Sequence, residues 1–169
     1  YTVVRFATEI GYTGYPELQQ AMQEMIRNKL TSVQRMQVTE GRIKNNDILD
    51  SIFTQDMDII RRTMEENSHE NFYNAVEAIC QSRKIYILGA RSSLALATFL
   101  RYYLGLLFDH VVLVQCTSEA EIFEQMIRVN EQDVVIGISF PRYSRKAVKA
   151  MNFAHNQGAK VVAITDSTL

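Results

Sequence analysis

Cysteine is scarce in this sequence, and its scarcity excludes several kinds of site. The 169 residues include two cysteines, Cys80 in a stretch with helical periodicity and Cys116 at the end of an apolar run. These positions predict buried free thiols rather than a disulfide or a metal-binding pair. Redox and zinc chemistry are therefore not expected.

Long apolar runs are also missing. A membrane-spanning helix needs about 18 consecutive apolar residues, and every apolar run here stops well short of that length. The chain does not open with the basic and apolar segments of a secretory signal. We therefore expect a cytoplasmic protein with no membrane partner. Its net charge of −1 argues against nonspecific binding to polyanions.

The second half of the chain contains four short runs rich in β-branched residues. They cover residues 85–88, 111–114, 134–138 and 161–164. Helical patterns separate them, at residues 92–107, 119–129 and 144–157. Alternating strands and helices are typical of a doubly wound parallel sheet. The predicted fold class is therefore α/β, with a flavodoxin-like parallel sheet.

The first part of the chain is helical. Residues 3–10 have helical spacing and Gly11 follows as a stop signal. Pro16 suits the first position of a second helix, and apolar residues recur with helical spacing again from Ile48 to Met64. Such stripes are usually core, and binding to a partner is the alternative.

The composition divides the chain into three predicted parts. Residues 1–30 form a helical module, residues 31–47 a polar linker, and residues 48–169 the α/β domain. Ser68 is expected to be the N-cap of a further helix. The sequence begins inside a helix and stops just after a strand, so we expect both ends to be cut from a longer protein.

Hydroxyl and basic residues gather where the first and third predicted strands end. The first leads into Gly89-Ala90-Arg91-Ser92-Ser93 and the third into Ser139-Phe140-Pro141-Arg142-Tyr143-Ser144, and these two segments are called the exit loops below. In a flavodoxin-like sheet, ligands bind beside the carboxyl ends of these two strands, where the winding direction reverses. Each exit loop leads into a helix, whose N–H groups and positive dipole end suit an anion.

The exit loops offer several complementary contacts to an anion. Ser139 and Ser144 can donate hydrogen bonds to phosphate or carboxylate oxygens, Gly89 lets the backbone approach, and Arg91 or Arg142 can add a charge-assisted contact. Alternatively, Ser92 and Ser144 only cap their helices and the arginines are ordinary solvated charges. Capping explains one hydroxyl in each loop, whereas each loop has two.

No nucleotide motif accompanies the exit loops. A dinucleotide fold requires G-x-G-x-x-G and an acidic residue at the end of the second strand. Here Gly89 stands alone, and the second strand ends in Gln115-Cys116. The lysine of the G-x-x-x-x-G-K-[ST] loop is absent too. NAD and ATP are therefore not expected, and no cofactor is predicted.

Three segments of the α/β domain together resemble a sugar isomerase (SIS) domain: ILGARSS at 87–93, SFPRYS at 139–144 and GAKVVAITD at 158–166. The opening residues 2–18, TVVRFATEIGYTGYPEL, resemble the end of the helix-turn-helix in the MurR/RpiR family of bacterial transcription regulators. The two resemblances follow the family's order and cover nearly the whole chain. Their co-occurrence is more specific than either motif alone.

This resemblance implies a sensor that binds a phosphorylated sugar or related metabolite and, as a homodimer or homotetramer, binds operator DNA. The opening helix would be most of a recognition helix, which enters the major groove. Thr2 and Arg5 would then face DNA, while Val3, Val4 and Phe6 would mostly pack.

The resemblance also assigns the serines of the exit loops. Ser92-Ser93 match the family's first phosphate loop, and Ser139 and Ser144 match the outer hydroxyls of its S-x-S-G-x-[ST] loop. Pro141 stands in place of the central serine and Arg142 in place of the glycine, so this loop loses a hydroxyl and gains a cation. A phosphosugar is the expected ligand, and a ligand with other acidic groups stays open.

A phosphosugar isomerase is the alternative function. It would need a general base, usually Glu or His, against the substrate carbon. His69 stands near a helix start, His110 before the second strand and His155 late in a helix, which are poor positions for this role. Glu119 and Glu121 follow the second strand, but acids in a first helical turn commonly serve as dipole partners or caps. An enzyme is therefore not expected.

Overall fold

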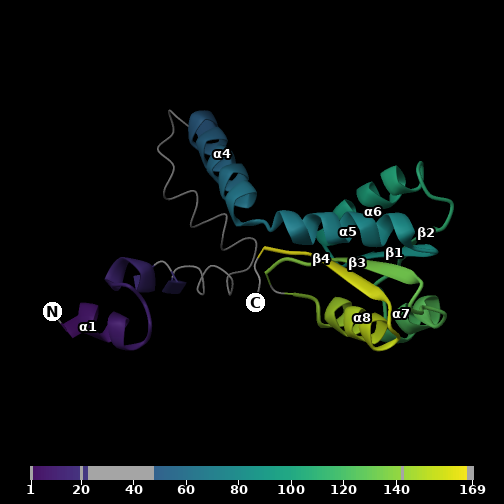
Figure 1. Cartoon of the computed structure of the whole chain (residues 1–169). Helices are drawn as coiled ribbons and strands as arrows, with labels where there is room; N and C mark the ends of the chain where they lie inside the picture. The colour runs from purple at the N-terminus through teal and green to yellow at the C-terminus, as the bar shows by residue number, and fades with distance from the viewer. Residues whose placement is uncertain (1, 20, 23–47, 142, 167–169) are drawn as a thin grey trace. The chain divides into compact units, whose positions relative to one another are not determined.

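The computed structural model of the chain describes residues 2–19, 21–22, 48–141 and 143–166 (Figure 1). The chain divides into two compact units, residues 1–65 and residues 66–169. The predicted linker at 31–47 and the predicted ligand-binding residue Arg142 lie outside the described residues. The predicted domain boundaries stay predictions. In the described part of the chain, no helix is long and apolar enough to span a bilayer.

The first unit begins with α1 (Thr2–Glu9), as predicted. Gly11 lies beyond its end with a φ of +96°, a left-handed conformation that favours glycine. A second helix begins at Tyr15, where the Glu17 carboxylate accepts hydrogen bonds from the hydroxyl and the backbone N–H of Thr13. These bonds, the hydroxyl bond first, hold the pKa of Glu17 below its ordinary value.

Few side chains of the first unit are buried. Ala7 and Leu18 are its buried apolar residues within the described ranges. Val3, Val4 and Phe6 are each more than half exposed, so the prediction that they mostly pack is wrong for the described residues.

The predicted long helix is confirmed as α4 (Ile48–Glu66), but the prediction that its apolar stripe is core is wrong. None of its residues is buried within the part of the chain that is described. Phe53, Met57, Ile60 and Met64 are between 57% and 68% exposed. Helical periodicity therefore located the helix correctly without showing whether its apolar face is covered.

The second unit contains the predicted doubly wound parallel sheet. Its strands are β1 (Lys84–Gly89), β2 (Val111–Val114), β3 (Asp133–Ile138) and β4 (Lys160–Ile164). They pair in the order β2-β1-β3-β4, and every pairing is parallel. The chain moves outward from β1 to β2 in one direction and from β3 to β4 in the other. The winding direction therefore reverses between β1 and β3, as predicted.

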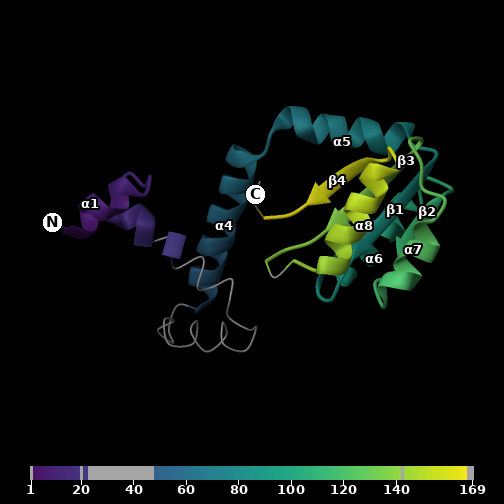
Figure 2. The same cartoon turned by 90° about the horizontal axis from the view of Figure 1, so that it is seen from below.

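Helices cover both faces of the sheet: α5 (His69–Gln81) and α6 (Ser93–Leu104) on one, and α7 (Glu119–Met126) and α8 (Arg145–Asn156) on the other (Figure 1). In Figure 2, α8 lies in front of the sheet and α6 behind it. Alternation along β1 supplies both cores, since Ile85 and Ile87 pack toward α5 and α6, and Tyr86 and Leu88 toward α7 and α8.

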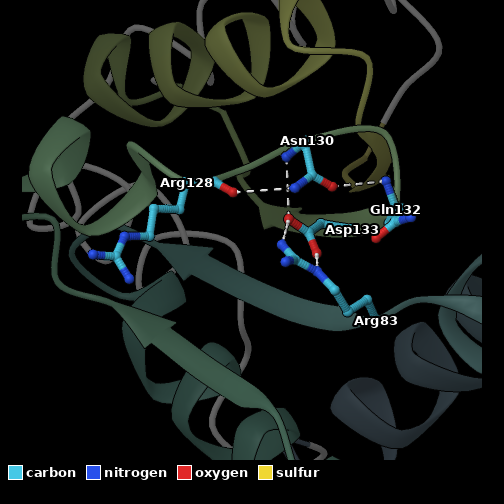
Figure 3. Close-up of polar contacts among 5 residues, drawn as sticks. All are labelled: Arg83, Arg128, Asn130, Gln132 and Asp133. Carbon is cyan, nitrogen blue, oxygen red and sulfur yellow. Dashed lines mark hydrogen bonds and ion pairs between the residues drawn. The ribbon is translucent and has the colours of Figure 1, made fainter.

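An ion pair joins the amino-terminal ends of β1 and β3 (Figure 3). Arg83 donates to Asp133 through Nε at 3.0 Å and through Nη2 at 2.9 Å. The Asp133 side chain is fully buried and also accepts from the backbone N–H of Asn130 at 3.1 Å. Asn130 in turn accepts from the Gln132 N–H at 3.0 Å. The buried carboxylate thus orders the turn before β3 and holds it against β1.

Replacing Asp133 with alanine should lower the free energy of unfolding by roughly 2–4 kcal/mol, because three hydrogen bonds to a buried charge are lost. Urea denaturation followed by circular dichroism measures this change. Glu119→Gln, which breaks an exposed ion pair with Lys149, is the control and should cost about 1 kcal/mol or less. Equal effects of the two substitutions would contradict the role given to the buried carboxylate.

Candidate functional site

The sheet brings the two exit loops side by side. Gly89, the last residue of β1, lies opposite Ile138, the last residue of β3, in the parallel register. Neighbouring strands lie about 4.8 Å apart, so the exit loops leave the sheet as neighbours. The Ser139 N–H then donates to the Ile164 carbonyl at 3.1 Å, which fixes the start of the second exit loop against β4.

Gly89 is required by packing within the protein. A Cβ atom at this position would lie 2.5 Å from the Ser93 carbonyl oxygen in α6, so only glycine allows the helix to approach the strand this closely. The prediction that Gly89 admits a ligand stays a prediction. Arg91 follows with a φ of 57°, which costs a non-glycine residue roughly 1–2 kcal/mol, and its side chain is exposed.

Serine occupies the N-cap position of all four helices of the second unit, but only two of these serines cap. Ser68 accepts from the Asn71 N–H at 3.2 Å, and Ser118 accepts from the Glu121 N–H at 3.1 Å. Ser92 before α6 and Ser144 before α8 make no such side-chain bond within the described residues. The interpretation that these two serines merely cap their helices is therefore wrong.

The other serine of each exit loop is buried. Ser93 is 5% and Ser139 8% exposed, and no hydrogen bond between described residues uses either hydroxyl. No fully buried side-chain oxygen lacks a partner in the described part of the chain, so these hydroxyls retain contact with solvent. The second exit loop is itself held in place, because the Tyr143 hydroxyl donates to Asp166 at 2.7 Å.

The second exit loop and α8 are strongly basic. The sequence has no Asp or Glu between Asp133 and Asp166, and the first turn of α8 has no acidic residue. By contrast, acidic residues occupy the first turns of α5 and α7, where their negative charge interacts favourably with the positive end of the helix dipole. An anion bound before α8 would supply the negative charge that its sequence lacks.

The end of β2 contributes residues that the sequence analysis did not assign to the site. The Cys116 thiol lies there, half-buried, near the Gly89 backbone N–H and the Lys146 ammonium. Burial raises the pKa of Cys116, while the Gly89 N–H and the Lys146 charge oppose that rise. Cys80 is also free but exposed, so the prediction that both thiols are buried is wrong for Cys80.

The two predicted DNA-binding residues lie in α1, away in sequence from the exit loops. Thr2 is the first residue of that helix. Arg5 is 82% exposed on its side chain and forms an ion pair with Glu9 at 3.3 Å. Neither observation tests contact with DNA, and both assignments stay predictions.

A comparison with known families decides the identity of the second unit. The family model of the SIS domain matches residues 78–169, which contain all four strands and both exit loops. The chain belongs to the SIS domain family. The predicted resemblance to MurR/RpiR transcription regulators is confirmed by the relatives of this SIS domain.

A relative that matches nearly the whole chain is a transcription regulator. A helix-turn-helix transcriptional regulator of Clostridium perfringens is 20% identical over 99% of this chain, which spans 59% of that relative. The SIS domain is similar to the sugar isomerase domain of an RpiR transcription factor from Sphaerobacter thermophilus, with 29% identity and a TM-score of 0.67 over 73% of this chain and 69% of that one.

A third relative confirms the fold. The Vibrio vulnificus NanR protein, solved in complex with ManNAc-6P, has a TM-score of 0.65 and 18% identity over 99% of this chain and 57% of its own length. This chain thus covers little more than half of the NanR chain and of the Clostridium regulator.

The carboxyl ends of the strands form the edge of the sheet that carries the exit loops, called the exit edge below. Alkylation of the two cysteines measures how far this edge is shielded from solvent. At pH 8, we expect iodoacetamide to react with Cys116 about tenfold more slowly than with the exposed Cys80, because burial and a raised pKa both lower the reactive thiolate. The Cys116 rate should rise with pH up to its raised pKa. Mass spectrometry of the two peptides gives both rates, and equal rates would contradict the shielded position.

Proposed function

We propose that this protein is a DNA-binding transcription regulator whose SIS domain binds a phosphorylated sugar or a related anionic metabolite. One observation carries the proposal: serine hydroxyls cap α5 and α7, whereas α6 and α8, which follow the exit loops, have uncapped N-termini. The Ser93 and Leu94 N–H groups of α6 already donate to the carbonyls of Ala90 and Arg91, so the available backbone donors are the N–H groups that open α8. Beside the unpaired serine hydroxyls of the exit loops, these are donors that can bind an oxyanion.

The ligand-binding residues follow from this arrangement. Ser92-Ser93 and Ser139 would donate to the phosphoryl oxygens, together with Ser144 and the N–H groups that open α8. Gly89 would keep the backbone close to the ligand, and Arg91 and Arg142 would add charge. The ManNAc-6P bound by NanR supports a phosphorylated sugar as the ligand class.

A regulator is favoured over an isomerase because the acidic residues near the site have structural partners. Glu119 forms an ion pair with Lys149 at 2.9 Å, and Glu121 accepts a hydrogen bond from the Thr117 hydroxyl. His110 precedes β2 at the opposite edge of the sheet, and His155 lies in the last turn of α8. Asp166, beside the second exit loop, likewise accepts hydrogen bonds from the Tyr143 and Thr165 hydroxyls, so each of these three carboxylates already has a partner among the described residues.

DNA binding is proposed for the opening helix. Arg5 lies in an exposed ion pair with a neighbour one turn away, and such pairs contribute about 1 kcal/mol or less. A phosphate or a base can therefore replace Glu9 as its partner at little cost, with Thr2 on the same helix. A homodimer or homotetramer would present two such helices to an operator.

Ligand binding would be coupled to DNA binding by a population shift. The ligand would favour one arrangement of the SIS domains, and residues 31–47 with α4 would transmit it to the spacing of the DNA-reading helices. An operator affinity of the full-length protein that is unchanged by ligand would refute this coupling.

Ser139→Ala tests the proposed ligand site. Glucose 6-phosphate at about 100 times its Kd should raise the Tm of the protein by roughly 5–11 °C, since it binds the folded state. The alanine variant should bind about tenfold more weakly, because one hydrogen bond to a charged group is lost. Differential scanning fluorimetry measures both, with glucose as the uncharged control.

Ser118→Ala is the matched variant, since it removes a serine that caps α7, the helix after β2, and that is not assigned to the ligand. It should lower the Tm without ligand and leave the shift caused by glucose 6-phosphate intact. If phosphorylated sugars give no shift, or if the shift in Ser139→Ala is as large as in the unmodified protein, the proposed site is wrong.

A further inference from the structure

Lys146 lies across the end of β1. It stands in the first turn of α8, which follows β3, and its ammonium donates a hydrogen bond to the Thr117 carbonyl after β2. Because β1 lies between β2 and β3 in the sheet, this hydrogen bond spans the carboxyl end of β1. The Lys146 charge also acts on the Cys116 thiol, which places the ammonium beside the β2 end of the exit edge.

The position of Lys146 is electrostatically unfavourable without a ligand. A cation in the first turn opposes the positive end of the helix dipole, at a cost of a few tenths of a kcal/mol to about 1 kcal/mol. Arg145 adds a second cation in the same turn. The exit loop before them contributes a third, Arg142, and no acidic residue. A bound anion would turn this cost into a favourable contact.

Lys146 also has donors to spare. An ammonium has three N–H donors, and the Thr117 carbonyl takes one. Among the described residues, no carboxylate pairs with Lys146. Lys149, one turn further along α8, differs because Glu119 binds its ammonium at 2.9 and 3.0 Å. The two lysines of α8 therefore differ. A carboxylate neutralises the charge of Lys149, whereas no carboxylate among the described residues neutralises that of Lys146.

A buried hydroxyl lies at the start of the loop that leads to Lys146. Ser139 is 8% exposed, and its hydroxyl takes part in no hydrogen bond between described residues. It precedes α8 by the length of the second exit loop, so Ser139 and Lys146 mark the two ends of one basic, hydroxyl-lined segment. The open donors therefore extend from the β3 end of the edge to its β2 end.

We infer that Lys146 forms a second anion subsite, which binds a carboxylate of a phosphorylated sugar acid. This inference rests on the proposed function, in which the exit loops bind the phosphoryl group. The hydroxyls of the two exit loops and the N–H groups that open α8 serve one oxyanion, and the Lys146 ammonium at the β2 end serves another as a point charge. The preferred ligand then has two acidic groups, one at each end of the sugar chain.

Two open-chain ligands isolate the second subsite. 6-Phosphogluconate and glucitol 6-phosphate share the carbon chain and phosphate, and they differ only in a carboxylate against a hydroxymethyl group at the other end. By isothermal titration calorimetry, the protein should bind 6-phosphogluconate about tenfold more tightly, since one charge-assisted contact is gained. Lys146→Gln should abolish this preference and leave the Kd for glucitol 6-phosphate within about twofold.

Two variants separate the effect of Lys146 from general charge and from folding. Lys146→Arg should keep the preference, and Lys149→Gln should change neither Kd, although it removes the same charge one turn away. Circular dichroism establishes that each variant is folded. A preference that is absent from the unmodified protein, or that survives in Lys146→Gln, overturns the second subsite.

The same titrations distinguish failure of the subsite from failure of the proposed function. If both ligands bind equally and Ser139→Ala weakens both, the phosphate site stands and the second subsite is wrong. If neither ligand binds to the unmodified protein, the proposed function and the subsite fail together.

Discussion

The parallel pairing of β1 with β3 is the interaction on which the candidate site depends. It runs from Lys84 opposite Asp133 to Gly89 opposite Ile138, and the Arg83–Asp133 pair holds its amino-terminal end. A slip of one residue would turn every side chain of a strand to the other face of the sheet. It would also move Gly89 away from α6 and Ser139 away from the first exit loop. An ion pair with a buried carboxylate at one edge of the sheet therefore aligns the hydroxyls at the other.

In the second unit, the caps and charges at the helix N-termini distinguish two helices that are closed by their own residues from two helices that are left for a ligand. Ser68 and Ser118 close α5 and α7, and acids in the first turns of both helices complement the dipole. The helices α6 and α8 follow the exit loops without a side-chain cap, and α8 opens with two cations. Because the same residue type stands at all four positions, its surroundings decide whether serine stabilises a helix or remains free for a ligand.

Local patterns in the sequence predicted the local structure well. The four β-branched runs became the four strands, their flavodoxin-like order was confirmed, and Ser68 caps α5 as expected. Periodicity alone did not show that the apolar stripe of α4 has no buried residue, because a helix has the same period whether or not a neighbour covers it. The exposure of Cys80 was misjudged for the same reason.

Long-range contacts were beyond the reach of sequence patterns. Asp133 and Arg83 are fifty positions apart, and nothing in their neighbourhoods indicates that they meet. Lys146 and Thr117 are separated by 29 positions, so the contribution of β2 to the exit edge was missed. Gly89 was noticed for its possible approach to a ligand, whereas its packing against Ser93 follows only from the position of α6. Patterns thus predicted where the site lies and only some of its residues.

The central claim is that an anionic ligand binds between the exit loops of β1 and β3. The most direct test is a titration of the ¹⁵N-labelled protein with glucose 6-phosphate, followed by two-dimensional NMR of the backbone amides. The account predicts that the largest shift changes fall at residues 90–94 and 139–147, with saturation at a single Kd. Shift changes confined to the opposite edge, around Arg83 and Asp133, or spread weakly over the whole surface, would contradict it.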